Sequence, residues 1–256
     1  MLKKISINKI SELAAALMGK GLLLAPVKEN SGYNFAEIKN PNQVDLDFHN
    51  TIASPKAAFF PHKEDFIKYE TGKPIGAASV IGLNLPPTFL FGVRPCDVKS
   101  FGIMDIHFNA SGIIDPYWKQ RREVTTIFGY AFDLEKPAEK EEFYQTLGIG
   151  AADPEDSDVF MVKKGEDLLL DSVTPKGEKL LAELKNLDED KPADKKYYDE
   201  YLKKGREYKT RNMCLEPEAI TKKLEDLFHN TDFWNRVSSA CLSCGICTFV
   251  CPTCYC

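Results

Sequence analysis

The sequence has 256 residues, of which 43% are hydrophobic, and it carries a formal net charge of −5. This length suffices for one large domain or two modest ones. The negative charge argues against a general nucleic-acid partner, because such binders need an excess of basic residues to release counterions from phosphate.

Predicted strands are mixed with predicted helices along residues 1–182, which indicates an α+β fold, a mixed α/β body. Apolar side chains near helical spacing predict a helix over 8–19. Shorter helices are expected at 63–69 and at 97–105, the latter with Asp97 as its N-cap. Apolar, alternating or β-branched runs predict strands at 21–27, 33–38, 77–84, 88–93 and 124–132. Residues 158–162 and 167–173 flank Lys164–Gly165 and predict a hairpin.

The composition changes after residue 182. Residues 183–236 are rich in charge and poor in aliphatic side chains, so we interpret them as a solvated helical connector. Within it, Pro217 is expected in the first turn of an amphipathic helix. A second helix, with Thr231 or Asp232 as its cap, leads into the end of the chain. Its apolar stripe of Phe233, Trp234 and Val237 indicates core packing.

Residues 237–256 carry the most informative pattern. Cys241, Cys244, Cys247 and Cys251 follow the spacing C-x2-C-x2-C-x3-C, and a proline comes directly after the last of them. This is the bacterial ferredoxin run for a [4Fe–4S] cluster, and thiolates are soft donors that suit such clusters. Gly245 lets the backbone approach a bulky ligand because it has no Cβ. We therefore expect an incomplete ferredoxin-like, helical iron–sulfur segment here.

Other uses of the four cysteines fit less well. A structural zinc site normally divides its ligands into two pairs separated by a longer loop. A disulfide framework belongs to short secreted chains. No apolar run approaches the roughly 18 residues of a membrane span, and the start of the chain is too polar for a signal peptide. We expect a cytoplasmic protein without a membrane span.

The role of Cys251 is open at this point. In ferredoxins with two clusters, the fourth cysteine of such a run binds the other cluster. No second quartet occurs before the end at Cys256. Either Cys251 completes a single cluster, or it serves a second cluster on a continuation of the chain. We expect the native gene to continue and to encode another quartet. Cys254 and Cys256 are possible further ligands, although we favour a role as bystanders.

A second segment, FGVRPCDVKSFGIMD (91–105), places Arg94, Cys96 and Asp97 between a predicted strand and a predicted helix. Ligands bind at the carboxyl ends of strands in α/β sheets, and a helix N-terminus lowers the pKa of a cysteine. A ligand pocket or an extra redox sulfur is therefore one interpretation. We favour the other, a turn with a buried, inert cysteine. No nucleotide-binding glycine motif or catalytic motif occurs, which disfavours a flavin or nicotinamide site in this chain.

Three phrases carry a resemblance to a known family. They are SPKAAFFPHKE (54–64), the 91–105 segment, and CLSCGICTFVCPTCYC (241–256). In order and separation they resemble the iron–sulfur subunits of anaerobic sulfite reductases and the beta subunits of soluble sulfhydrogenases, which are ferredoxin-like proteins with two [4Fe–4S] clusters. This chain departs from the family by ending before a second quartet and by having no cysteine between Cys96 and Cys214.

The resemblance implies that Cys241, Cys244, Cys247 and Cys251 bind a cluster. It also implies two partners: a redox subunit that binds flavin and NAD(P)H, and a catalytic reductase or hydrogenase subunit. We therefore expect a non-catalytic electron-transfer subunit of an oxidoreductase complex. The alternatives are a redox or iron sensor, and a reductase with its own substrate pocket. The substrate of the final reductase and the direction of electron flow are not specified by this chain.

Overall fold

The computed structural model describes residues 1–30, 32–61, 63–65, 67–69, 71–72, 74, 79–80, 83–112, 114–136, 142–208 and 217–255. Its strands are β1 Leu2–Ser6, β2 Leu22–Glu29, β3 Gly32–Glu37, β4 Ile67–Lys68, β5 Ser79–Val80, β6 Thr88–Val93, β7 Thr125–Tyr130, β8 Val159–Lys164, β9 Asp167–Ser172 and β10 Asp188–Glu189. Its α-helices are α1 Ile10–Met18, α2 Pro95–Phe108, α3 Pro116–Val124, α4 Pro175–Glu183, α5 Pro192–Glu207, α6 Pro217–Leu227, α7 Thr231–Ser238 and α8 Ile246–Val250.

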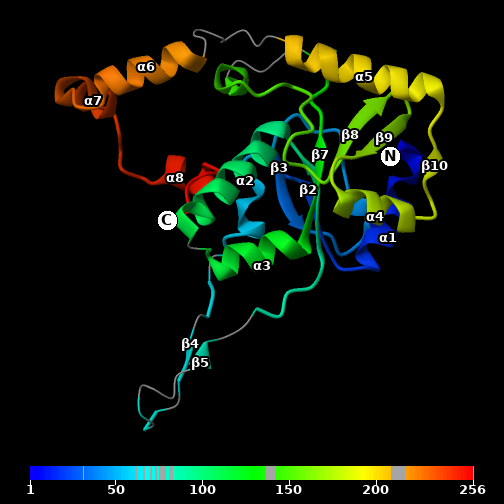
Figure 1. The fold of residues 1–256 in the computed structure, drawn as a ribbon, viewed down its shortest axis with the longest axis horizontal. Helices are drawn as coiled ribbons and strands as arrows, with labels where there is room; N and C mark the ends of the chain where they lie inside the picture. Colours follow the sequence, from blue (N-terminus) through cyan, green and yellow to red (C-terminus); the bar gives the residue numbers. More distant parts are fainter. Residues whose placement is uncertain are drawn as a thin grey trace.

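The main sheet has the strand order β10-β1-β9-β8-β7-β6-β2-β3 (Figure 1). Strands β2, β6, β7 and β8 run parallel to one another, whereas β3, β9, β1 and β10 pair antiparallel on the two flanks. Parallel strands need crossover connections, and these connections place helices on the faces of the sheet. The mixed α/β body predicted from the sequence is therefore confirmed.

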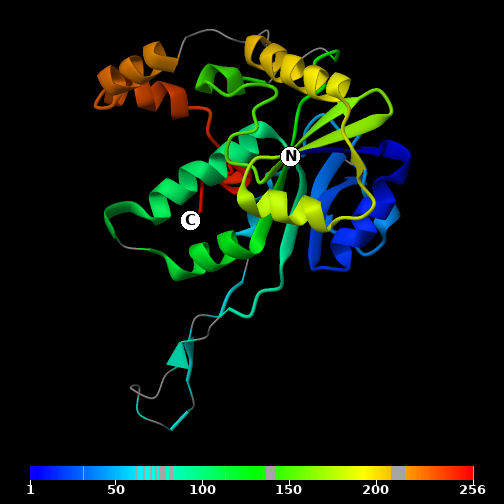
Figure 2. The same cartoon turned by 45° about the vertical axis from the view of Figure 1, so that its right-hand side comes forward.

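Both faces of the central strands are buried. In β6, Phe89 and Phe91 enter one hydrophobic cluster, while Leu90 and Val93 enter another on the opposite face. Helices α1 and α4 cover the first face, and α2 and α3 cover the second (Figure 2). Because all six residues of β6 and of β7 are buried, the loops at their carboxyl ends are held by a rigid support.

The sequence predictions for the body miss β1, α3 and α4, and they also fail at short elements and at caps. The predicted helix at 63–69 is wrong, since Ile67–Lys68 form a strand that pairs with Ser79–Val80. The predicted strand at 77–84 shrinks to those two residues, and positions 77, 78, 81 and 82 lie outside the described residues. Asp97 is not an N-cap, because Pro95 already occupies the first turn of α2 and Arg94 is the cap.

The hairpin predicted around Gly165 and the longer predicted strands are confirmed. Strands β2 and β3 pair antiparallel, as do β8 and β9 around Gly165, whose φ of 58° lies in the left-handed region that favours glycine. In α7 the cap is Asn230, whose side chain accepts a hydrogen bond from the Phe233 N–H. The predicted caps Thr231 and Asp232 are therefore wrong by one or two positions.

The helices after residue 182 differ in how closely they pack against the body. Helix α5 packs on the sheet through Tyr198, which is 1% exposed and belongs to a cluster with Phe160, Val162 and Leu169. The expectation of a purely solvated helix is wrong for α5. In contrast, α6 and α7 stand away from the sheet (Figure 1). Trp234 and Val237 of α7 are 40% and 60% exposed, so the predicted core packing of that stripe is also wrong.

We expect α5 to contribute to the stability of the body through Tyr198. The Tyr198→Ala variant should lose about 3–5 kcal/mol of free energy of unfolding, because it leaves a cavity against the sheet. Tyr198→Phe is the matched control. The Tyr198 hydroxyl is buried without a hydrogen-bond partner among the described residues, so its removal should be neutral or slightly stabilising. Urea unfolding followed by circular dichroism measures both variants. A loss below about 1 kcal/mol in Tyr198→Ala would contradict this packing.

Candidate functional site

The four cysteines of the predicted cluster motif lie on a loop and one short helix. The chain leaves α7 through a turn in which the Cys241 N–H bonds the Ser238 carbonyl at 2.9 Å. Ser243 and Gly245 then take left-handed φ values of 54° and 74°. Helix α8 follows at once, and its i to i+4 hydrogen bond from the Cys251 N–H to the Cys247 carbonyl is 3.1 Å long. Cys247 and Cys251 therefore lie on the same side of this turn.

The sulfur atoms have polar neighbours. The Ser243 N–H donates to the Cys241 sulfur at 3.4 Å, and the Cys251 sulfur lies 3.2 Å from the Thr253 hydroxyl oxygen. Partial burial raises the pKa of the Cys251 thiol, but hydrogen bonds from Thr253 and Cys254 outweigh it and leave that pKa lowered. Hydrogen bonds of this kind stabilise thiolates, which are the form that binds metals.

The described cysteine side chains are not gathered around one point. Cys241, Cys244 and Cys247 are exposed, while Cys251 and Cys254 are half-buried. Among the residues that the structure describes, no three cysteine, histidine or carboxylate side chains are grouped closely enough to hold a metal ion. Cys214 and Cys256 lie outside the described residues. The spacing, the exposed thiols and the left-handed loop nevertheless fit a four-thiolate cluster, since exposed side chains exchange rotamers freely.

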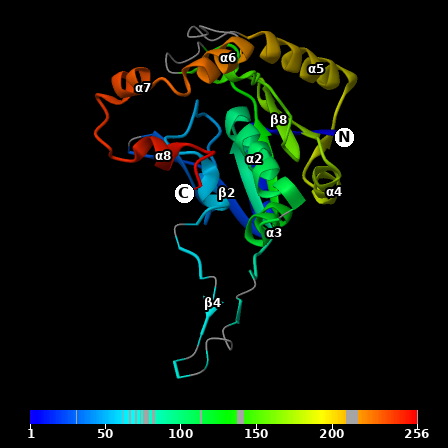
Figure 3. The same cartoon turned by 60° about the vertical axis from the view of Figure 1, so that its left-hand side comes forward.

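Lys56, which is not among the predicted site residues, holds the segment that carries these cysteines. Lys56 belongs to the short 3-10 helix Pro55–Ala58. Its ammonium donates to the carbonyl oxygens of Thr248, Cys251 and Cys254 at 3.0, 2.9 and 2.8 Å. Figure 3 shows α8 and the end of the chain beside this part of the body and beside α2. Lys56 lies in the first of the three resemblance phrases, which was the available sequence signal.

Tyr255 forms a second attachment. Its hydroxyl lies 2.7 Å from Nε2 of His107, at the end of α2. Its ring packs against Phe108 and Phe60, with centroid distances of 5.2 and 6.2 Å. Aromatic pairs at such distances contribute beyond simple area burial. The cysteine segment, residues 241–255, is thus attached to the body at two places, by Lys56 and by Tyr255.

Arg94 is a structural residue. It is 3% exposed, and its guanidinium donates to the carbonyls of Phe48, His49, Tyr130 and Ala131. It also lies 4.2 Å from the centroid of the Phe48 ring. Burial lowers the pKa of Arg94 to about 10, which still leaves it charged at neutral pH. The guanidinium therefore ties the 48–49 loop to the carboxyl end of β7.

Two titratable residues, Cys96 and Asp97, follow Arg94 in the first turn of α2. Burial is the main cause that raises the pKa of the Cys96 thiol, and this side chain packs against the cluster of Phe132, Tyr144 and Ile149. A thiol with a raised pKa is a poor nucleophile and a poor ligand, which supports the interpretation of Cys96 as inert. Burial also raises the pKa of Asp97 to about 7, although Arg94 lowers it in part.

A cavity of about 440 Å³ lies between the start of α2 and the cysteine segment. Its lining includes Asp97 and Ile103 from α2, Glu142 and Tyr144 from the neighbouring loop, and Cys251 and Thr253. Oε1 of Glu142 bonds Nε2 of His49. Its other oxygen, like the Tyr144 hydroxyl, is buried without a partner among the described residues. The predicted 91–105 segment and the cysteine motif therefore meet at one hollow.

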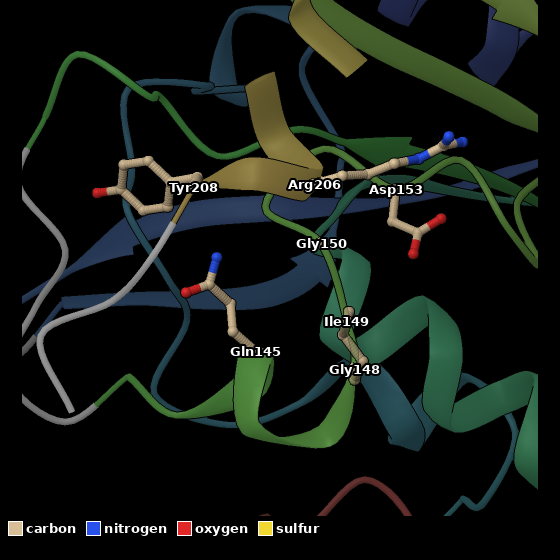
Figure 4. A pocket seen from close by; sticks show the side chains of 7 residues that line it. All are labelled: Gln145, Gly148, Ile149, Gly150, Asp153, Arg206 and Tyr208. Atoms are coloured by element: carbon tan, nitrogen blue, oxygen red, sulfur yellow. The ribbon is translucent and has the colours of Figure 1, made fainter. Parts of the chain in front are cut away.

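A smaller hollow of about 280 Å³ lies at the end of α5 (Figure 4). The backbone of Gly148 and Gly150 forms one wall, and Arg206 and Asp153 stand together at one side. These two side chains carry opposite charges, so the hollow does not select for a ligand of either sign. None of its lining residues belongs to the cysteine motif.

Comparison with known proteins gives one informative match. The chain is 28% identical over 241 residues to the beta subunit of sulfhydrogenase 2 from Pyrococcus furiosus, and the match covers 92% of this chain and 67% of that protein. No protein-family model matches the chain. Among the described helices, none combines the length and the apolar character that crossing a membrane requires.

We expect Asp97 to make stability depend on pH. Its pKa is 3.8 in an ordinary setting and about 7 in the fold. Between these values the folded chain keeps a proton that the unfolded chain has released. Stability therefore falls as pH rises through this window, by at most about 1.4 kcal/mol per pH unit. The Asp97→Asn variant should remove this slope.

Urea unfolding measured between pH 4 and pH 7, roughly the window between the two pKa values, tests this expectation. Asp188→Asn is the matched control, because Asp188 is exposed on the edge strand β10 and its replacement should leave the slope unchanged. An Asp97→Asn slope equal to that of the wild type would show that the carboxyl group is already ionised in the fold.

Proposed function

We propose that this chain, which is related to the soluble sulfhydrogenase beta-subunit family, is an electron-transfer iron–sulfur subunit of an oxidoreductase complex. Cys241, Cys244, Cys247 and Cys251 are the proposed ligands of a [4Fe–4S] cluster. The observation that carries the proposal is the C-x2-C-x2-C-x3-C-P run on an exposed, left-handed loop. The relationship to a hydrogenase subunit supports the oxidoreductase class.

The protein groups have separate tasks in this proposal. The four thiolates bind the iron atoms, and Cys254 stands next to Cys251 as a hydrogen-bond partner rather than as a ligand. The Ser243 N–H, 3.4 Å from the Cys241 sulfur, reduces the negative charge on that thiolate. When bound, a cluster of this type accepts and returns one electron at a time. If the chain continues beyond Cys256, Cys251 is the ligand that would belong to a second cluster.

The loop also presents an apolar surface to a partner. Leu242, Ile246 and Phe249 are 90%, 63% and 57% exposed on the turn that carries the thiols. Exposed apolar side chains grouped in this way mark protein interaction sites. We propose that a redox subunit binding flavin and NAD(P)H, or a catalytic reductase or hydrogenase subunit, docks over this turn, which would bring its redox group close to the cluster.

A second candidate function is a reductase with its own substrate site. The observation that favours it is the cavity beside α2, which holds Asp97 and a Glu142 oxygen that has no partner among the described residues, next to Cys251 and Thr253. It is the weaker candidate, because burial raises the pKa of the Cys96 thiol in the cavity wall, which makes it a poor nucleophile, and because the sequence has no flavin or nicotinamide motif. Reduction by NADPH distinguishes the two candidates, as described below.

The cluster is tested by replacing its central ligand. Protein made and purified without oxygen should be brown, and Cys244→Ser should lose most of its iron, because Cys244 is a ligand whichever cluster Cys251 serves. Cys96→Ala is the matched control and should keep its iron, since Cys96 is packed among apolar side chains. Iron and acid-labile sulfide assays provide the measurement. Full iron in Cys244→Ser, or stoichiometric zinc in the wild type, would refute the cluster.

The electron-transfer role is tested by comparing two reductants, dithionite and NADPH. Nicotinamides deliver a hydride, so a lone one-electron centre needs a flavin to separate the two electrons. Dithionite should bleach the visible absorption of the purified chain, while NADPH alone should leave it unchanged. Addition of a flavin subunit that co-purifies from native cells should allow NADPH to reduce the cluster within seconds. Fast bleaching of the chain alone by NADPH would favour the reductase instead.

A further inference from the structure

The ammonium group of Lys56 directs all of its donors at the cysteine segment. A lysine ammonium has three N–H donors and no acceptor. In Lys56 they reach the carbonyl oxygens of Thr248, Cys251 and Cys254 at 3.0, 2.9 and 2.8 Å. These three distances are those of well-formed hydrogen bonds. One cation on the body therefore binds three peptide groups of one segment that is distant in sequence.

The three carbonyls belong to the end of α8 and to the turn that follows it. The last carbonyls of a helix have no intrahelical donor, and Thr248 belongs to α8 while Cys251 is its C-cap. Cys254 lies in the turn that follows, where its N–H already bonds the Cys251 carbonyl at 3.3 Å. Lys56 thus completes the hydrogen bonding of the turn that bears the fourth ligand and fixes its place on the body.

We propose that Lys56 positions the cysteine segment and, through its charge, raises the reduction potential of the cluster bound there. The inference rests on the proposed function and goes one step further, since it names a residue outside the motif. Reduction adds one negative charge to the cluster, and a fixed cation nearby stabilises that charge. Net charge and hydrogen bonding around the site are the main means by which proteins set these potentials.

The segment has a second attachment, which makes the proposal testable. Tyr255 lies 2.7 Å from Nε2 of His107 and packs on Phe108, contacts in which Lys56 takes no part, so we expect them to persist when Lys56 is replaced. The substitution therefore removes a charge and three hydrogen bonds without releasing the end of the chain. We expect Lys56→Met to fold and to keep its iron.

The experiment compares three variants of the full chain, reconstituted without oxygen. Lys56→Met removes the charge, Lys56→Arg keeps it, and Lys20→Met removes an equal charge at Lys20, which bonds Glu183 instead of the segment. Iron content, the reduction potential in a dithionite titration followed by visible absorption, and amide hydrogen exchange of residues 246–254 are measured for each.

In Lys56→Met we expect the equilibrium constant for one-electron reduction of the cluster to be about tenfold lower, which corresponds to a reduction potential about 59 mV more negative. We also expect faster hydrogen exchange of the 246–254 amides. Lys56→Arg should retain most of the potential, and Lys20→Met should match the wild type in both measurements. A merely structural role would change exchange but leave the potential of Lys56→Met unchanged, and that result would overturn the proposal.

The outcomes separate this inference from the proposed function. A wild type without iron would refute the cluster and with it the effect on potential, whereas a brown wild type with an unchanged Lys56→Met potential would refute only the role of Lys56. If Lys56→Met loses its iron, Lys56→Gln serves as a second neutral variant, because its amide can still donate to a carbonyl. A potential equal to that of the wild type in Lys56→Gln would likewise overturn the proposal.

Discussion

The buried guanidinium of Arg94 is the constraint on which the candidate site depends. A charged group without solvent is tolerated only when its hydrogen bonds are satisfied. Arg94 meets this condition with backbone carbonyls from two separate places, residues 48–49 and residues 130–131. The loop before the 3-10 helix Pro55–Ala58 is thereby fixed against the end of β7. Lys56 follows on the same stretch of chain, just before Phe59, which packs in the core cluster of α2 and α3.

The cysteine segment shows why such polar attachments matter. Neither α7 nor α8 buries a side chain, so this part of the chain has no apolar core of its own. Its place on the body is set by the ammonium of Lys56, by the contacts of Tyr255, and by the turn hydrogen bonds. A segment held in this way can keep its thiols and its apolar loop residues exposed to a partner, which a well-packed core would not allow.

The sequence predicts the parts of the fold where periodic burial dominates. The parallel strands β6 and β7 are continuous apolar runs, and the hairpin around Gly165 has clear turn residues, so both are found. Prediction fails where tertiary contacts decide the outcome. Tyr198 lies in a strongly charged stretch, and its burial becomes visible only when the sheet surface that it covers is known. The start of α2 is set by Pro95 and not by the better capping residue Asp97.

The four cysteine ligands stay a prediction, which rests on their spacing because a cluster motif is local in sequence. The surroundings of the motif are not predicted. The partners of that motif are distant in sequence. Lys56 lies in the first resemblance phrase but carries no pattern that shows which groups it binds, and His107 gives no sign of its contact with Tyr255. Whether residues 183–236 form a separate connector stays a prediction.

The three phrases that carry the family resemblance meet in space. Lys56, from the first phrase, bonds the carbonyls of the last. Side chains of the second phrase, Asp97 and Ile103, line the same cavity as Cys251 and Thr253. The three phrases therefore belong to one surface, at which the body holds the cysteine segment.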